Sequence, residues 1–89
     1  MKFEFDPAKS AANKAKHGID FVEAQALWRD GSWAESLSQV NLGGESRFLA
    51  IGRIEGKHWT AICTLRGEAV RIIAVRRSRK EEIRYYEGS

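Results

Sequence analysis

Basic side chains are concentrated in one segment near the C-terminus of this 89-residue chain. Between Arg66 and Lys80, six Lys and Arg residues stand against a single carboxylate, Glu68, so this segment carries a charge of +5 in a chain whose formal net charge is +3. The other residues therefore sum to −2. A localised positive charge attracts polyanions through counterion release, which favours phosphate groups as targets, with an acidic protein partner as the alternative.

Most cations of this segment are arginines, the side chains best suited to phosphate chemistry. The planar guanidinium stays charged and meets two phosphate oxygens at once. If RNA is cleaved without a metal, such cations stabilise the charge that grows on the phosphorane, while other groups supply a base and an acid. The candidates for contact with the reacting phosphate are Arg66, Arg76 and Arg77, and Arg71 is a candidate for binding the strand.

Alternation along a strand decides which arginines face the same way. In the strand expected from Ala69 to Arg77, a period of two places Arg71 and Arg77 on one face and Arg76 on the other. Arg76 and Arg77 are therefore expected to have different roles. We expect an exposed Arg76 guanidinium because the strand ends there, whereas Arg77 is either a phosphate ligand or a solvated charge.

Three further cations are candidates for binding RNA, each with a simpler alternative. Arg79 and Lys80 either contact the nucleic acid or face water on a terminal helix, as charged runs usually do. Arg47 either contacts RNA or pairs with Glu45 at the end of a polar loop.

Few groups in this sequence are suited to proton transfer. His17 has a pKa near neutrality and lies beside Lys16, a further RNA-binding candidate, but it is equally suited to hydrogen-bonding the last carbonyls of a helix. Tyr85 is a candidate for stacking on a base or donating a hydrogen bond to phosphate, whereas Tyr86 is expected to pack on the sheet. Glu82 is a further group of this kind.

Composition limits the classes of protein. A single cysteine, Cys63, forms no internal disulfide and is expected in the core, and it forms no metal-ligand spacing with the two distant histidines. We therefore expect no metal and no cofactor. No apolar run approaches the roughly 18 residues of a membrane span, and the N-terminus lacks the apolar stretch of a signal peptide. A cytoplasmic protein without membrane contact is expected.

Helical signals are confined to the two ends of the chain. Asp6-Pro7 and Gly18 are typical of the start and end of a helix, whose Ala8, Ala11, Ala12 and Ala15 form a narrow face for close packing, with Asn13 pointing away. Asp20 and Glu23 form a capping box for a second helix with a buried stripe of Phe21, Ala24, Leu27 and Trp28. Ser78 with Glu81 predicts the cap of a closing helix.

Strand signals fill the middle of the chain, with a short first strand at Phe3 and Phe5. Alternation begins at Trp33, and further strands are expected over residues 47–54, 58–65 and 69–77, joined by turns at Gly56 and Gly67. The sequence therefore predicts a single α+β domain over residues 1–89, in which an antiparallel sheet carries two N-terminal helices and one C-terminal helix.

Several segments, taken in order, resemble the BrnT family of type II toxins. They are Phe5-Asp6 with Lys9 and Asn13, Lys16-His17-Gly18-Ile19, Phe21 with Glu23-Ala24, Glu45-Ser46-Arg47, Ile51-Gly52, Arg66-Gly67, the run from Arg71 to Arg77, and Glu81 with Tyr85-Tyr86. Each alone is weak, but together they span nearly the whole chain.

This resemblance implies a RelE-like fold and a ribonuclease that inhibits translation as the toxin of a toxin-antitoxin pair. It also implies neutralisation by a co-encoded BrnA-like antitoxin with a DNA-binding ribbon-helix-helix portion. Such a module is a two-fold dimer, so we expect a two-plus-two complex that binds DNA only through the antitoxin. The antitoxin is expected to cover Arg71, Arg76 or Arg77.

Two other functions fit the same basic segment. A non-catalytic RNA-binding module needs the cations but no proton-transfer group beside them, and a protein-interaction subunit needs only an acidic partner. A strong salt dependence of RNA binding favours a nucleic-acid function over the last alternative. A metal-dependent nuclease fits poorly, because the sequence has no evident carboxylate cluster.

Overall fold

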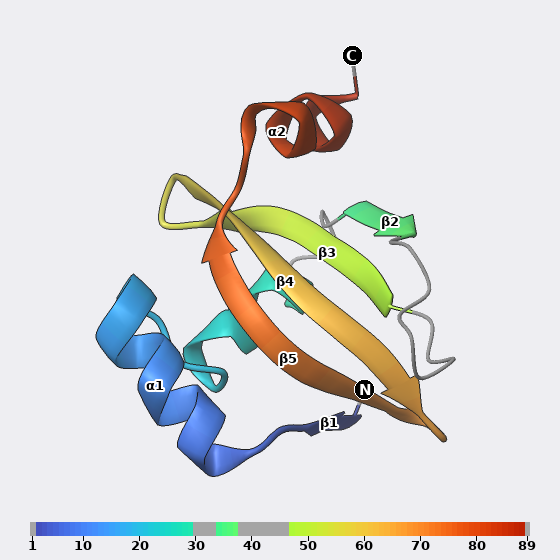
Figure 1. The fold of residues 1–89 in the computed structure, drawn as a ribbon. Coiled ribbons are helices and arrows are strands. Elements are labelled where there is room, and N and C mark those ends of the chain that lie inside the picture. The colour runs from blue at the N-terminus through green and yellow to red at the C-terminus, as the bar shows by residue number, and fades with distance from the viewer. Residues whose placement is uncertain (1, 30–33, 38–46, 89) are drawn as a thin grey trace.

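The computed structural model describes residues 2–29, 34–37 and 47–88 (Figure 1). The elements run in the order β1 (Lys2–Glu4), α1 (Pro7–His17), the 3₁₀ helix η1 (Glu23–Trp28), β2 (Ala34–Leu37), β3 (Arg47–Ile54), β4 (Lys57–Arg66), β5 (Ala69–Arg77) and α2 (Lys80–Glu87). The expected bounds of β3 and β5 are confirmed. The expected loop 38–46, with Glu45, lies outside the described residues.

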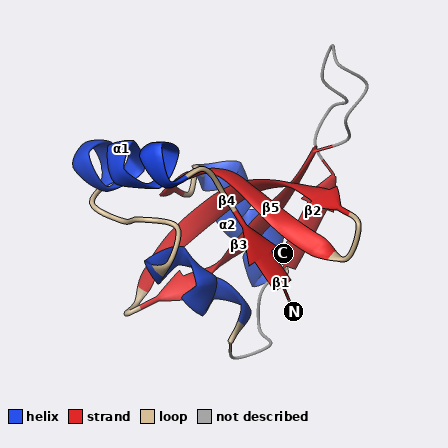
Figure 2. Cartoon of the chain, turned by 90° about the horizontal axis from the view of Figure 1, so that it is seen from below, coloured by secondary structure: helices blue, strands red, loops and turns tan. Residues whose placement is uncertain are grey.

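The strands form one sheet in the order β1-β5-β4-β3-β2. Figure 2 shows it as a single twisted layer. Strands β2 to β5 pair antiparallel, but β1 pairs parallel to β5, with Lys2 opposite Ala69. The prediction of a purely antiparallel sheet is therefore wrong, because the chain returns to the β1 edge only after the long crossover that a parallel pair requires.

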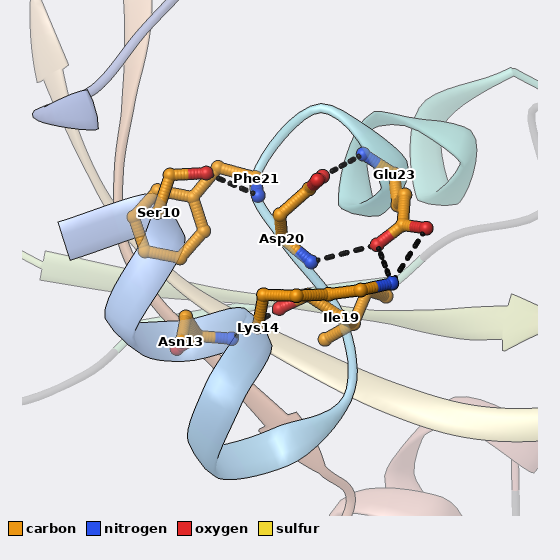
Figure 3. Close-up of polar contacts among 7 residues, drawn as sticks. All are labelled: Ser10, Asn13, Lys14, Ile19, Asp20, Phe21 and Glu23. Atoms are coloured by element: carbon orange, nitrogen blue, oxygen red, sulfur yellow. Dashed lines mark hydrogen bonds and ion pairs between the residues drawn. The ribbon is translucent and has the colours of Figure 1, made fainter. Parts of the chain in front are cut away.

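Two helical segments follow β1, but only α1 is an α-helix. The Asp20–Glu23 capping box is present in both directions, with Glu23 N–H donating to Asp20 Oδ1 at 2.7 Å and Asp20 N–H to Glu23 Oε1 at 2.9 Å (Figure 3). The segment that it starts is the 3₁₀ helix η1. Phe21, just before η1, and Ala24 and Leu27 within it are fully buried and recur every three positions. This spacing matches three residues per turn and corrects the expectation of a second α-helix.

The buried face of α1 also differs from the prediction. All four alanines of the expected face are exposed, and the helix buries Ser10 and Asn13 instead. Ser10 Oγ accepts from Phe21 N–H at 2.9 Å, and Asn13 Nδ2 donates to Ile19 O at 2.8 Å (Figure 3). Both polar side chains are buried because they bind the backbone of the segment that follows α1. The expected caps, Asp6 and Gly18, are confirmed.

The core lies between α1, η1 and one face of the sheet, and this face is called the helix face below. The sheet contributes Phe48, Ala50, Ala61, Cys63, Val70, Ile72 and Val75, and the 19–27 segment contributes Ile19, Phe21, Ala24 and Leu27. Cys63 is fully buried, as expected. The opposite face is called the open face, and α2 covers one end of it, because Glu82 of α2 contacts Thr60 and Arg76 there.

A β-bulge in β5 determines which side chains share a face. Cys63 pairs with Ile72, whereas Ile62 pairs with Ala74, so Ile73 is an extra residue on β5. Val75 therefore returns to the helix face beside Ile72, and the alternation beyond it is inverted. Arg76 shares the open face with Arg71, while Arg77 lies on the helix face, which corrects the predicted grouping of Arg71 with Arg77.

Helix α2 begins one residue later than predicted. Its N-cap is Arg79 rather than Ser78, and the backbone N–H of Arg79 donates to Oε1 of Glu82 at 2.8 Å. Glu82 therefore takes the place expected for Glu81. Ser78 instead bonds Thr60, with 2.8 Å between the two hydroxyl oxygens.

Candidate functional site

Two arginines flank a threonine in one row across the open face. Arg47 of β3 pairs with Thr64 of β4, and Thr64 pairs with Arg71 of β5. Directly paired residues point to the same face, with Cβ atoms about 4.5 to 5.5 Å apart. The two arginine side chains therefore rise from the same face on either side of β4, about 10 Å apart, which is two inter-strand spacings. The row Arg47–Thr64–Arg71 is called the lower row.

The lower row retains donor capacity for an anion. Arg71 is 30% exposed, and its contact with Glu4 is long, at 3.9 Å between Nη1 and Oε2. The Nε of Arg47 is buried and has no hydrogen-bond partner among the described residues. Arg66 is exposed at the end of β4, on the same face. These three arginines form a positively charged end of the open face.

A second row lies about 13 Å further along β4, four residues at about 3.3 Å each. Here Ile51 pairs with Thr60, and Thr60 pairs with Arg76. Between the two rows, Leu49, Ile62 and Ala74 form an apolar strip of half-buried side chains. The open face thus has cations at both ends and apolar surface between them, an arrangement that suits a strand of phosphates and bases.

Arg76 is held by Glu82, contrary to the expectation that its guanidinium is exposed. Nη1 donates to Oε1 at 2.8 Å and Nη2 to Oε2 at 2.7 Å, and the two side chains are only 22% and 9% exposed. The cause is α2, which turns back over the end of the strand and places its acidic first turn on Arg76. The hydrogen bonds from Arg76 lower the pKa of Glu82 to about 2, and those same bonds raise the pKa of Arg76.

Arg77, Lys16 and His17 belong to the other side of the sheet. The Arg77 guanidinium lies 5.5 Å from the centroid of Trp59, and its Nε donates to His58 O at 3.2 Å. Lys16 and His17 end α1, which packs on the helix face. The structure therefore divides the sequence candidates into two groups, of which the larger lies on the open face.

Helix α2 carries the remaining candidates and one contact that the sequence did not indicate. Arg79, Lys80 and Tyr85 are exposed. His58, expected to be an exposed strand residue, is half-buried, with Nε2 at 2.8 Å from Glu87 Oε2 and its ring edge-on to Tyr86. Residues so distant in sequence have no local signal that predicts their contact.

The described residues contain neither a metal-binding cluster nor a membrane-spanning helix. Across residues 2–29, 34–37 and 47–88, no group of three or more His, Cys, Asp and Glu side chains is arranged to hold a metal ion. Over the same residues, no helix has the length and apolar character needed to cross a membrane.

A model of one protein family matches residues 5–82, and its description is "Ribonuclease toxin, BrnT, of type II toxin-antitoxin system". This chain belongs to the BrnT family. The match includes both rows of the open face and ends at Glu82, the partner of Arg76. A search of curated proteins gave no significant match. Membership of BrnT supports cleavage of RNA in general and implies a protein antitoxin as partner.

Proposed function

We propose that this BrnT protein is a metal-independent endoribonuclease that binds RNA across the open face and thereby inhibits translation in the cytoplasm. The observation that carries the proposal is the lower row, because Arg47 and Arg71, on the two strands that flank β4, point to the same face. Arginine forks whose stems start about 10 Å apart can bind phosphates of one RNA strand. The apolar strip beside them gives ribose and base a surface to rest on.

The proposed roles follow from position. Arg47 and Arg71 bind the strand, Arg66 extends the basic surface, and Arg76 at the other end stabilises charge on the phosphorane. Arg79 and Lys80 add positive charge from the start of α2. Tyr85 is the proposed proton-transfer group, because α2 lies on the same side of the sheet as these arginines.

The second group has a supporting role in this proposal. Lys16, His17 and Arg77 lie toward the helix face, where they contact RNA that passes the edge of the sheet. His17 is thus proposed as a binding residue in place of its expected role in proton transfer, because the larger set of arginines lies on the opposite face.

The decisive experiment is incubation of purified protein with RNA in EDTA. Cleavage that is slowed by Arg71→Ala and unaffected by Lys9→Ala, an exposed cation on α1, supports the proposal. Intact RNA at excess folded protein contradicts it. Salt-sensitive binding without cleavage would instead identify a non-catalytic RNA-binding module.

The antitoxin is proposed to be a BrnA-like ribbon-helix-helix protein in a two-plus-two complex. The family implies an antitoxin, and the two-fold symmetry of such a module brings two toxins together. Expression of this chain alone should arrest growth, and co-expression of the antitoxin should restore it. The mass of the purified complex in solution then tests the stoichiometry.

A further inference from the structure

We propose that Glu82 is a positioning residue: it holds one edge of the Arg76 guanidinium so that the other edge faces an RNA phosphate. This inference rests on the proposed function, in which Arg76 contacts the reacting phosphate. It assigns Glu82 a role in positioning Arg76 that its place on the helix does not otherwise require.

Glu82 binds one edge of the Arg76 guanidinium. A guanidinium has five N–H donors, arranged as an end-on edge formed by Nη1 and Nη2 and a side-on edge formed by Nε and Nη2. Glu82 takes the end-on edge, through bonds of 2.8 Å from Nη1 and 2.7 Å from Nη2. The second N–H of Nη1 is directed to Arg77 O at 3.3 Å.

Two of the five N–H donors of Arg76 remain for a ligand. After these three bonds, Arg76 retains the Nε–H and one Nη2–H, and neither has a further partner among the described residues. These two donors form the side-on edge, which matches two oxygens of one phosphate. Arg76 therefore binds phosphate without giving up Glu82, and its plane is fixed before the substrate arrives.

Two further hydrogen bonds hold the Glu82 carboxylate in place. Its Oε1 also accepts from Thr60 Oγ1 at 2.9 Å and from Arg79 N–H at 2.8 Å. Thr60 is fully buried and lies directly opposite Arg76 in the sheet. The carboxylate is therefore anchored to the strand next to Arg76 and to the first turn of α2, and it transmits that rigidity to the guanidinium. Preorganised donors of this kind stabilise a transition state more than a ground state.

The test is the steady-state cleavage of a short RNA by wild type, Glu82→Gln, Arg76→Lys and the double variant. Glu82→Gln keeps Oε1 as an acceptor for Thr60 and Arg79. It removes the negative charge and replaces Oε2, the acceptor for Arg76 Nη2, with an amide group that donates. We expect it to lower kcat on the order of 10- to 100-fold while KM changes less than about twofold. The matched control is Glu81→Gln, the exposed neighbour on α2, which should retain full activity.

Non-additivity separates positioning from a structural role. If Glu82 acts through Arg76, the double variant is no slower than Arg76→Lys alone. An unchanged kcat in Glu82→Gln, or losses that multiply in the double variant, overturns the inference. Should Glu82→Gln fail to fold, Thr60→Val replaces it, because it removes one bond to Oε1 and leaves the ion pair. A kcat lowered about threefold or more at constant KM then supports positioning, and an unchanged kcat contradicts it.

A second readout does not depend on activity, so failure of the proposed function is distinguishable. The Arg76 Nε–H resonance is followed by nuclear magnetic resonance as inorganic phosphate is added. A shift in wild type that is lost in Glu82→Gln supports positioning, even if wild type leaves RNA intact. Equal shifts in both proteins contradict positioning, even if wild type cleaves RNA.

Discussion

The side-chain amide of Asn13 pairs with both backbone groups of Val75. Nδ2 donates to Val75 O at 2.9 Å, and Oδ1 accepts from Val75 N–H at 3.1 Å, 62 residues away in sequence. Strand β1 pairs with β5 only as far as Arg71, so beyond that point Asn13 supplies the bonds that a neighbouring strand would otherwise make. It thereby joins α1 to the strand that carries Arg71 and Arg76.

Asn13→Ala should therefore destabilise the fold. The change leaves Val75 N–H, Val75 O and Ile19 O without their side-chain partner in a buried place, which costs about 2 to 4 kcal/mol in the free energy of unfolding. Urea denaturation measures the loss. Lys9→Ala on the exposed side of the same helix is the control, and equal midpoints for the two variants would contradict this account.

Asn13 also shows why sequence patterns misjudged α1. Its alanines have helical spacing and suggest a packing face, whereas Asn at a buried position is uncommon. Only the partners of Asn13 on β5 and in the 19–21 segment explain its burial, and periodicity contains no information on partners so distant. Caps depend on local geometry, so Asp6 and Gly18 were predicted correctly.

Glu82 should make stability depend on pH in the acid range. Its pKa falls from 4.5 to about 2 in the folded state, so the ionised carboxylate contributes stability that is fully present above the unfolded pKa. That contribution, about 2 to 3 kcal/mol, is lost as pH falls from about 5 through about 2. Urea midpoints measured across this range should fall in wild type and change less in Glu82→Gln. Parallel curves for the two proteins would contradict the assignment.

Arg71 should matter for RNA binding and cleavage more than its single charge suggests. Arg71→Ala removes one fork of the lower row and should lower kcat/KM about 10- to 100-fold, the loss of a charge-assisted phosphate contact. The slope of log Kd against the logarithm of the salt concentration should also decrease, by the amount expected for the loss of one phosphate contact. Lys9→Ala should change neither quantity. An Arg71→Ala protein that melts normally and retains both values would remove the open face from the proposed site.

Tyr85 and His17 give opposite expectations for proton transfer. Tyr85→Phe removes only a hydroxyl on α2, the helix on the side of Arg76, and should lower kcat about 100-fold or more. His17→Gln, at the end of α1, should change kcat less than about threefold, and any effect should appear in KM. Single-turnover cleavage measures both. A large kcat loss in His17→Gln with full activity in Tyr85→Phe would reverse the assignment.

The bounds of strand β5 could be predicted from the sequence, but its β-bulge could not. Its length and bounds follow from the apolar run and its flanking turns, and they were predicted correctly. The bulge at Ile73 was not, because Val-Arg-Ile-Ile-Ala-Val contains no Gly or Pro to indicate an extra residue. One inserted residue changes which arginines share a face, so the candidate residues were identifiable from sequence but their grouping was not.

That grouping leads to a prediction about the antitoxin. If an acidic segment of the antitoxin covers the open face, Arg71→Glu should weaken toxin-antitoxin binding by more than 1 kcal/mol, the usual limit for an exposed charge pair, whereas Arg77→Glu on the helix face should weaken it less. Calorimetry on folded variants measures both affinities. A larger loss for Arg77→Glu would place the antitoxin over Trp59 and the end of α1. Unchanged affinity in both would show that inhibition acts from a remote surface, because neither face of β5 would then lie in the interface.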